Sequence, residues 1–167
     1  MEYISSDTNV WIDFQVIERL HLPFLLPYTY IMYKESIDYE LLFPSGFRET
    51  LIDAGLIGVD MTIEEFSLAE LWGNKYPRLS TQDRIALAIA KQRNITLLTG
   101  DKALRKAAIQ ENVAIIGTLG VLDMLFDGNY IDAFEYKYCI TKLLEHNGVE
   151  VRLPVNELRR RLNMLMQ

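Results

Sequence analysis

Hydrophobic and polar positions along the chain alternate between short apolar runs and amphipathic stretches, which is the pattern of βαβ units. The short apolar and β-branched runs predict strands at residues 3–7, 28–33, 57–61, 95–99 and 113–117. The run at 95–99 (ITLLT) is almost wholly apolar, as expected for a parallel strand that is buried on both faces. The pattern therefore predicts an α/β fold around a parallel sheet.

Helices are expected between and after these runs. Two of them begin with the spacing of a capping box: Thr62 with Glu65 predicts a helix to about Lys75, and Ser80 with Asp83 predicts one to about Arg93. Apolar residues at helical spacing predict the other helices at about 10–20, 36–42, 48–54, 102–111, 130–146 and 155–166. No repeat or linker interrupts this series. We expect one domain over residues 1–167, with a core at about 3–127 and a helical extension at about 128–167.

Composition and charge narrow the function classes. The chain has 167 residues, of which 50% are hydrophobic and 24% charged, as in an ordinary folded domain. Its net charge of −6 argues against a protein that binds polyanions through bulk charge, but it allows a nuclease whose carboxylates bind metal. The single cysteine, Cys139, excludes an internal disulfide and fits a reducing compartment. We expect a cytoplasmic protein with no membrane segment, since the apolar stretch at 24–33 is too short to span a bilayer.

Four acidic residues fall where strands give way to helices, which is where ligands bind in open parallel sheets. Asp7 ends the first strand, Asp101 follows the strand at 95–99, Asp83 lies in the first turn of a helix, and Glu40 lies in the helix after the second strand. Three of them also have a simpler explanation. Asp83 could complete a cap with Ser80, Asp101 could be an N-cap, and Glu40 could be a solvated helix residue.

Taken together, the four acids point to a divalent metal. Two carboxylates about 4 Å apart repel each other by roughly 4 kcal/mol at an effective dielectric constant near 20, so a cluster is unfavourable without a cation. Oxygen ligands suit one or two Mg²⁺ or Mn²⁺ ions. Zinc is not expected, because His21 and His146 have no partner at ligand spacing and Cys139 stands alone. The sequence also lacks GxGxxG and GxxxxGK[ST], and neither histidine is placed for a Ser–His–Asp triad.

Five sequence blocks, taken in order, resemble the PIN-domain family of metal-dependent ribonucleases. They are SSDTNVWIDF, IMYKESIDYELL, STQDRIALAIAKQ, LLTGDKALRKAA and IIGTLGVLDML, and the last is typical of a branch that carries a GTLGVL segment. The resemblance covers about residues 3–127. It implies a three-layer α/β/α sandwich around a central parallel sheet, with acidic residues that hold Mg²⁺ or Mn²⁺ at its carboxyl edge.

The resemblance also assigns roles to single residues. Asp7, Asp83 and Asp101 match the first, third and fourth acids, and Glu40 matches the second, with Glu35 as the competitor. Lys34 stands where a proline is common in the family, which leaves that choice open. Asp7 and Asp101 are expected to ligate metal directly, and Asp83 and Glu40 through water. Thr8, Asn9 and Thr99 match the family's polar positions whose side chains orient these carboxylates.

The activity implied is metal-assisted hydrolysis of phosphodiester bonds in single-stranded RNA. Substrate phosphates would meet cations near the acids, for which Lys102, Arg105 and Arg84 are the candidates, whereas Arg159–Arg161 is interpreted as a solvated face. The branch points to the toxin half of a toxin–antitoxin pair, with an antitoxin protein as partner.

A homodimer is expected from apolar residues on short helices near 41–57 and 121–134, namely Leu41, Leu42, Phe43, Phe47, Leu51, Phe126, Tyr130 and Phe134.

Two alternatives lead to other functions. A non-catalytic PIN-like interaction module would keep the fold and use the acids only structurally. A phosphohydrolase of the HAD-like class also places an aspartate after its first strand, but that class resembles DxDxT and this chain has Asn9 where the second aspartate would stand.

Overall fold

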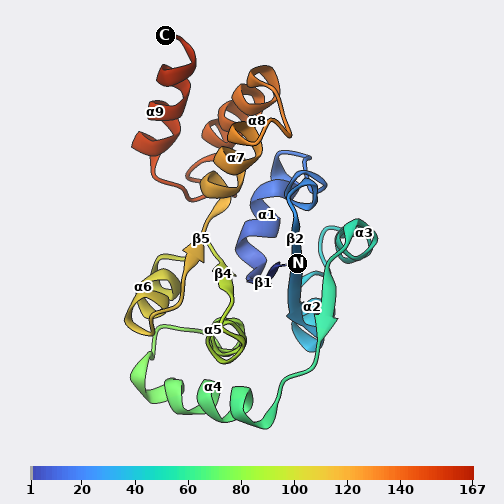
Figure 1. Cartoon of the computed structure of the whole chain (residues 1–167), viewed down its shortest axis with the longest axis vertical. Coiled ribbons are helices and arrows are strands. Elements are labelled where there is room, and N and C mark those ends of the chain that lie inside the picture. The colour runs from blue at the N-terminus through green and yellow to red at the C-terminus, as the bar shows by residue number, and fades with distance from the viewer. Residues whose placement is uncertain (1) are drawn as a thin grey trace.

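The computed structural model describes residues 2–167 and contains a five-stranded sheet in the order β3-β2-β1-β4-β5 (Figure 1). Every neighbouring pair of strands is parallel, and β1 lies at the centre, where Ser5 faces Ile31 on one side and Leu97 on the other. The strands are β1 (Glu2–Ser6), β2 (Tyr28–Tyr33), β3 (Ile57–Val59), β4 (Thr96–Leu98) and β5 (Ile115–Ile116). The predicted parallel sheet is confirmed.

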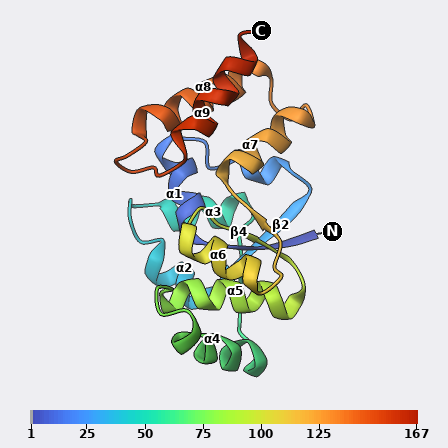
Figure 2. The same ribbon diagram turned by 90° about the vertical axis from the view of Figure 1, so that its left-hand side faces the viewer.

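Helices cover both faces of this sheet, so the molecule has three layers (Figure 2). One face carries α4 (Ile63–Lys75), α5 (Thr81–Arg93) and α6 (Lys102–Gln110). The core on the other face is built with α1 (Thr8–Val16), the 3₁₀ helix η1 (Leu22–Leu25), α2 (Lys34–Glu40), α3 (Phe47–Ala54), α7 (Thr118–Asp127), α8 (Ala133–His146) and α9 (Val155–Leu165). This is the expected α/β/α sandwich.

The two cores are separated by the alternation of side chains along each strand. Tyr30 and Leu98 pack into the core that contains Trp11, whereas Ile31 and Leu97 pack into the core that contains Trp72. Because each central strand is buried on both faces, the apolar runs in the sequence mark the strands well.

Both predicted capping boxes are present. The Thr62 hydroxyl accepts a hydrogen bond from the Glu65 amide (3.1 Å), and the Glu65 carboxylate accepts one from the Thr62 amide (2.8 Å). Ser80 and Asp83 make the same pair of bonds at 3.1 and 3.0 Å. These bonds satisfy amides that a helix start leaves without partners, so they fix where α4 and α5 begin.

Some strands are shorter than predicted. The runs expected at 57–61, 95–99 and 113–117 contain strands of only two or three residues each. Thr99 follows the last residue of β4: its amide still donates to the Ile116 carbonyl at 3.0 Å, and its hydroxyl donates to Asp7. Asp7, predicted to end the first strand, instead caps α1.

The expected apolar patch is partly wrong. Leu41, Phe47 and Leu51 are buried in the core beneath α1, where α2 and α3 close over the sheet. Phe126 is half-buried and stacks on Tyr136. The exposed members are Leu42, Phe43, Tyr130 and Phe134.

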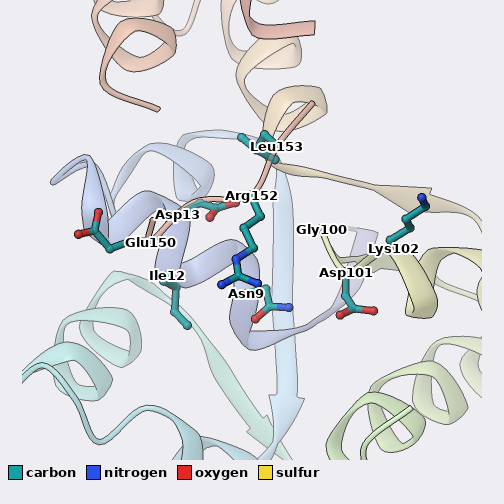
Figure 3. A pocket seen from close by; sticks show the side chains of 9 residues that line it. All are labelled: Asn9, Ile12, Asp13, Gly100, Asp101, Lys102, Glu150, Arg152 and Leu153. Carbon is teal, nitrogen blue, oxygen red and sulfur yellow. The ribbon is translucent and has the colours of Figure 1, made fainter. Parts of the chain in front are cut away.

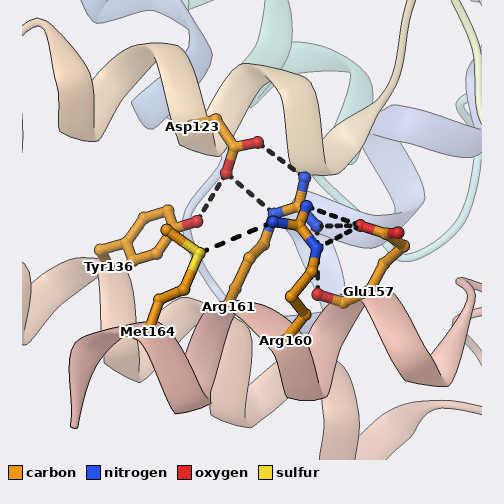
Figure 4. Close-up of polar contacts among 6 residues, drawn as sticks. All are labelled: Asp123, Tyr136, Glu157, Arg160, Arg161 and Met164. Carbon is orange, nitrogen blue, oxygen red and sulfur yellow. Dashed lines mark hydrogen bonds and ion pairs between the residues drawn. The ribbon is translucent and has the colours of Figure 1, made fainter. Parts of the chain in front are cut away.

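The C-terminal helix α9 is bound to the rest of the domain. Leu158 is fully buried, and Arg161 donates to both carboxylate oxygens of Asp123 on α7 at 2.9 and 2.7 Å (Figure 4). The interpretation of Arg159–Arg161 as a solvated face is therefore wrong for Arg161, whose side chain is only 11% exposed.

Within the described chain, no helix is both long enough and apolar enough to cross a membrane.

Candidate active site

Asp7 lies at the carboxyl end of the central strand β1 and is buried. Its carboxylate accepts hydrogen bonds from the Thr8 amide and from the Thr99 hydroxyl, both at 2.9 Å. The Thr99 hydroxyl also accepts a bond from the amide of Asp101 at 3.1 Å. One threonine thus joins the acid after β1 to the loop that carries the acid after β4.

Glu40, at the end of α2, reaches the same place from the next strand along the sheet. Its Oε2 accepts a hydrogen bond from the Thr8 hydroxyl at 2.6 Å. Its other carboxylate oxygen, Oε1, is buried and has no hydrogen-bond partner among the described residues. Glu35, the competing second acid, is exposed at the start of α2. The geometry therefore brings Glu40, rather than Glu35, next to the polar groups around Asp7.

Asp83 and Asp101 fulfil the simpler roles that the sequence allowed. Asp83 completes the capping box of α5, and Asp101 caps α6 by accepting a bond from the Leu104 amide at 2.8 Å. In each case a single carboxylate oxygen makes these bonds, and the described residues offer the other oxygen no donor. Helix capping leaves both acids able to act on a ligand.

Burial and neighbouring negative charges raise the pKa values of Asp7, Glu40 and Asp83. Burial raises the pKa of Asp7 from 3.8 to about 7, and the negative charges of Asp83 and Glu40 add to this rise against the bonds from Thr99 and Thr8. Burial and the charge of Asp83 raise the pKa of Glu40. Burial and the charge of Asp101 raise the pKa of Asp83, against the bonds from Ser80. The acids from four elements therefore share one electrostatic neighbourhood.

A narrow cavity of about 10 Å³ lies beside Asp7 and Glu40, with Ser6, Ser36 and Gln82 in its lining. That volume is about what one water molecule needs. Asp7 and Glu40, which has one carboxylate oxygen without a hydrogen-bond partner among the described residues, therefore line a space of the size of one water molecule.

The donor set fits a hard divalent cation, although no three acids of the described residues stand close enough together to form a ready metal site. Mg²⁺ keeps several waters and needs only one or two direct carboxylates in a protein. Asp7 and Asp101 are the residues that could ligate it, with Glu40 and Asp83 acting through water.

A larger pocket of about 540 Å³ opens beside Asp101 (Figure 3). Asn9 and Arg152 lie together on one side, where the Arg152 side chain extends toward Asn9, and Asp101 lies across from them. Arg152 comes from the segment between α8 and α9, so the C-terminal part of the chain supplies a cation to this pocket. No sequence pattern points to Arg152, because no spacing links it to the acids.

Comparison with protein-family models matches residues 3–165 to a family described as a PIN domain. The chain belongs to the PIN-domain family. No curated protein and no solved structure matched the chain. The match includes α8 and α9, and so extends past residue 127 where the motif resemblance ended. PIN domains are generally nucleases, which agrees with acids at the carboxyl edge of the sheet.

The three residues of this PIN domain that were predicted to bind substrate phosphates differ in their exposure and in their hydrogen bonds. Lys102 is exposed and lines the large pocket, although its side chain extends away from the Asp101 carboxylate (Figure 3). Arg105 is exposed, and its guanidinium lies near Gly117 at the end of β5. Arg84 is engaged elsewhere, because its guanidinium donates to the Ala69 carbonyl of α4 at 2.8 Å and to the Thr81 hydroxyl at 3.1 Å.

Of the three residues predicted to orient the carboxylates, Thr8 and Thr99 donate hydrogen bonds to them: Thr8 to Asp7 and Glu40, and Thr99 to Asp7. Asn9 is exposed and lines the large pocket without a hydrogen bond to any of the four carboxylates. The predicted role of Asn9 in orienting an acid therefore has no hydrogen bond to support it among the described residues.

Proposed function

We propose that this PIN domain is an endoribonuclease that hydrolyses phosphodiester bonds in single-stranded RNA with Mg²⁺ or Mn²⁺. The observation that supports it most is the state of Asp7. Its carboxylate is buried at the end of the central strand, and this burial, together with the negative charges of Asp83 and Glu40, raises its pKa to about 7. A buried acid that is held by two donors and surrounded by like charge gains most from a bound cation.

The proposal assigns a task to each group of residues. Asp7 and Asp101 would hold the metal, Glu40 and Asp83 would act through coordinated water, and Thr8 and Thr99 keep the carboxylates in place. When bound, the cation would polarise the phosphate and lower the pKa of a water molecule for in-line attack.

The substrate itself would be bound by cations of this chain. Arg152 and Lys102 line the pocket that opens beside Asp101. Arg152 would neutralise charge on a substrate phosphate, and Asn9 beside it would orient the strand by hydrogen bonding. This division places the phosphate between the acids and the segment that joins α8 to α9.

The biological setting proposed is that of a cytoplasmic toxin, neutralised by an antitoxin protein. The support is the GTLGVL segment, which follows β5 directly and forms the start of α7. A small antitoxin-like gene next to the one that encodes this chain is the expected observation.

A second candidate function is a non-catalytic interaction module, which is favoured by the lack of a ready three-acid metal site among the described residues. Asp7, Asp83 and Asp101 would then serve only as caps for α1, α5 and α6, and Glu40 only as a hydrogen-bond partner of Thr8. Calorimetric titration with Mn²⁺ separates the two functions, because a module predicts no binding heat and an enzyme predicts saturable binding.

Cleavage of a labelled single-stranded RNA tests the enzyme directly. The wild type is expected to cleave with Mg²⁺ or Mn²⁺ and to be inactive in EDTA. Arg152→Gln should lower the cleavage rate by about tenfold, as for the loss of one charge-assisted hydrogen bond of roughly 1.4 kcal/mol. Lys137→Gln, which removes an exposed charge on α8, is the matched control and should leave the rate unchanged. Full activity in EDTA would contradict the proposal.

A further inference from the structure

A second groove adjoins the site on the face of the sheet that carries α4, α5 and α6. It has a volume of about 410 Å³ and lies between one side of α6 and the loop that joins α4 to α5. Lys102 and Lys106 are four residues apart on α6, and both line the groove, as does Arg78 from the opposite wall. No acidic residue lines it.

The charge of this groove is unusual for the chain. The protein as a whole has a net charge of −6, yet four cations and no anion line the groove. Lys75, the fourth cation, is paired with Glu111 at 2.8 Å. Arg78, Lys102 and Lys106 are exposed and have no ion-pair partner among the described residues. Unpaired cations that converge on one groove favour an anionic ligand.

Each wall of the groove is continuous along the chain with a segment that carries one of the acids. The loop wall continues from Leu79 into Ser80 and Asp83, and the α6 wall begins at Lys102, directly after Asp101. Lys102 also lines the large pocket that contains Arg152, so the groove and the pocket share a residue. A chain of phosphates that lies in the groove would therefore continue toward the acids.

We propose that this groove binds the sugar-phosphate backbone of a single-stranded RNA on one side of the scissile phosphate, through Arg78, Lys102 and Lys106. The inference rests on the proposed function, since it names the path of that substrate. Cations spaced along an open groove bind a backbone without reading its sequence. The groove thus adds affinity for a long strand and has little effect on a substrate of one phosphodiester.

The test measures binding without cleavage. A fluorescein-labelled 20-nucleotide single-stranded RNA is titrated with protein in EDTA at several salt concentrations, and anisotropy gives the dissociation constant. Arg78→Gln with Lys106→Gln should weaken binding about 25-fold at 0.1 M salt, and should lower the slope of log K against log salt by about 1.4, from two lost phosphate contacts of about 0.7 each. Lys102 is left intact because it also lines the large pocket.

A matched control makes the same change in net charge elsewhere. Lys137→Gln with Arg159→Gln removes two exposed cations of α8 and α9 and should keep wild-type affinity and slope. The proposal is overturned if the groove variant binds like the wild type, or if the control loses as much as the groove variant. A groove variant that binds RNA like the wild type would assign the groove to another anionic ligand, such as an acidic protein segment.

A small substrate separates this inference from the proposed function. Hydrolysis of bis(p-nitrophenyl) phosphate with Mn²⁺ should be the same in the groove variant and the wild type, because the substrate is too short to reach the groove. If the wild type binds RNA through the groove but cleaves no phosphodiester, the proposed function fails and the groove stands. If it cleaves RNA and the groove variant cleaves and binds equally well, the groove fails and the proposed function stands.

Discussion

At the residue scale, the Asp7 carboxylate is held in place by hydrogen bonds, yet its surroundings disfavour its negative charge. Two hydrogen bonds at 2.9 Å hold its carboxylate, whereas burial and the neighbouring acids raise its pKa to about 7. The same geometry that positions Asp7 therefore disfavours its ionised form. A cation removes this conflict, because it favours the charged carboxylate and offsets the repulsion.

The pKa of Asp7 predicts how stability depends on pH without metal. The folded-state pKa of about 7 lies above the ordinary value of 3.8, so the folded state binds the proton of Asp7 more tightly than the unfolded state does. The contribution of this proton to the free energy of unfolding is therefore lost as pH rises from about 4 to 7. Asp7→Asn removes this loss. In EDTA the variant should be more stable than the wild type by about 1–3 kcal/mol near pH 8 and about equal to it near pH 4, as measured by urea unfolding.

Asp127→Asn makes the same chemical change at an exposed position and should alter stability by less than about 0.5 kcal/mol at both pH values. An Asp7→Asn protein that is less stable than the wild type near pH 8 would indicate that the carboxylate is needed for the fold itself.

At the element scale, local rules explain what the sequence could predict. The starts of α4 and α5 followed from acids three residues after a hydroxyl, and that spacing acts within one helical turn. The buried strands followed from apolar runs, although their ends were displaced by one or two residues, as at Thr99, which follows the last residue of β4. Glu40 followed from a motif, and the structure shows the hydrogen bond that brings it to Thr8.

Contacts between distant segments could not be predicted in this way. Arg152 and Arg161 have no local pattern that separates them from solvated cations, yet one lines the pocket beside Asp101 and the other is bound to Asp123. Leu41 and Phe47 show the converse, since an apolar residue on a short helix looks the same in sequence whether it faces the core or solvent. These positions depend on how the helices pack.

The attachment of α9 gives a prediction at this scale. Arg161 donates two hydrogen bonds to Asp123 and is nearly buried, whereas its neighbour Arg160 is mostly exposed and pairs with Glu157 (Figure 4). Arg161→Ala should lower the free energy of unfolding by about 1–3 kcal/mol, because it leaves Asp123 without its charged partner. Arg160→Ala should cost less than about 1 kcal/mol. Equal losses in the two variants, measured by urea unfolding, would contradict the anchoring role of Arg161.

At the scale of the whole molecule, the acids and the cations lie on different parts of the same sheet edge. The acids come from the ends of β1 and β4 and from α2 and α5, while cations from α6 and from the α8–α9 segment border them. The family match extends to residue 165, so the segment that carries Arg152 lies within the matched PIN domain. An overall negative chain can therefore offer a local path for a polyanion.

Self-association remains a prediction for the molecule as a whole. Phe43 and Phe134 are 84% and 79% exposed, which is unusual for large aromatic side chains. We expect a homodimer with a mass in light scattering of about twice 19.4 kDa, and we expect Phe43→Ser or Phe134→Ser to shift it toward the monomer. A single 19.4 kDa species for the wild type at micromolar concentration would contradict this prediction.

The most direct test of the central claim pairs RNA cleavage with thermal unfolding for Asp7→Asn, each with and without Mn²⁺. The wild type is expected to cleave single-stranded RNA and to melt at a higher temperature with Mn²⁺, because the ion binds only the folded state. The variant should remain folded, lose cleavage and gain little from Mn²⁺. A variant that cleaves at the wild-type rate, or a wild type whose melting temperature does not change with Mn²⁺, would contradict a metal-dependent site at Asp7.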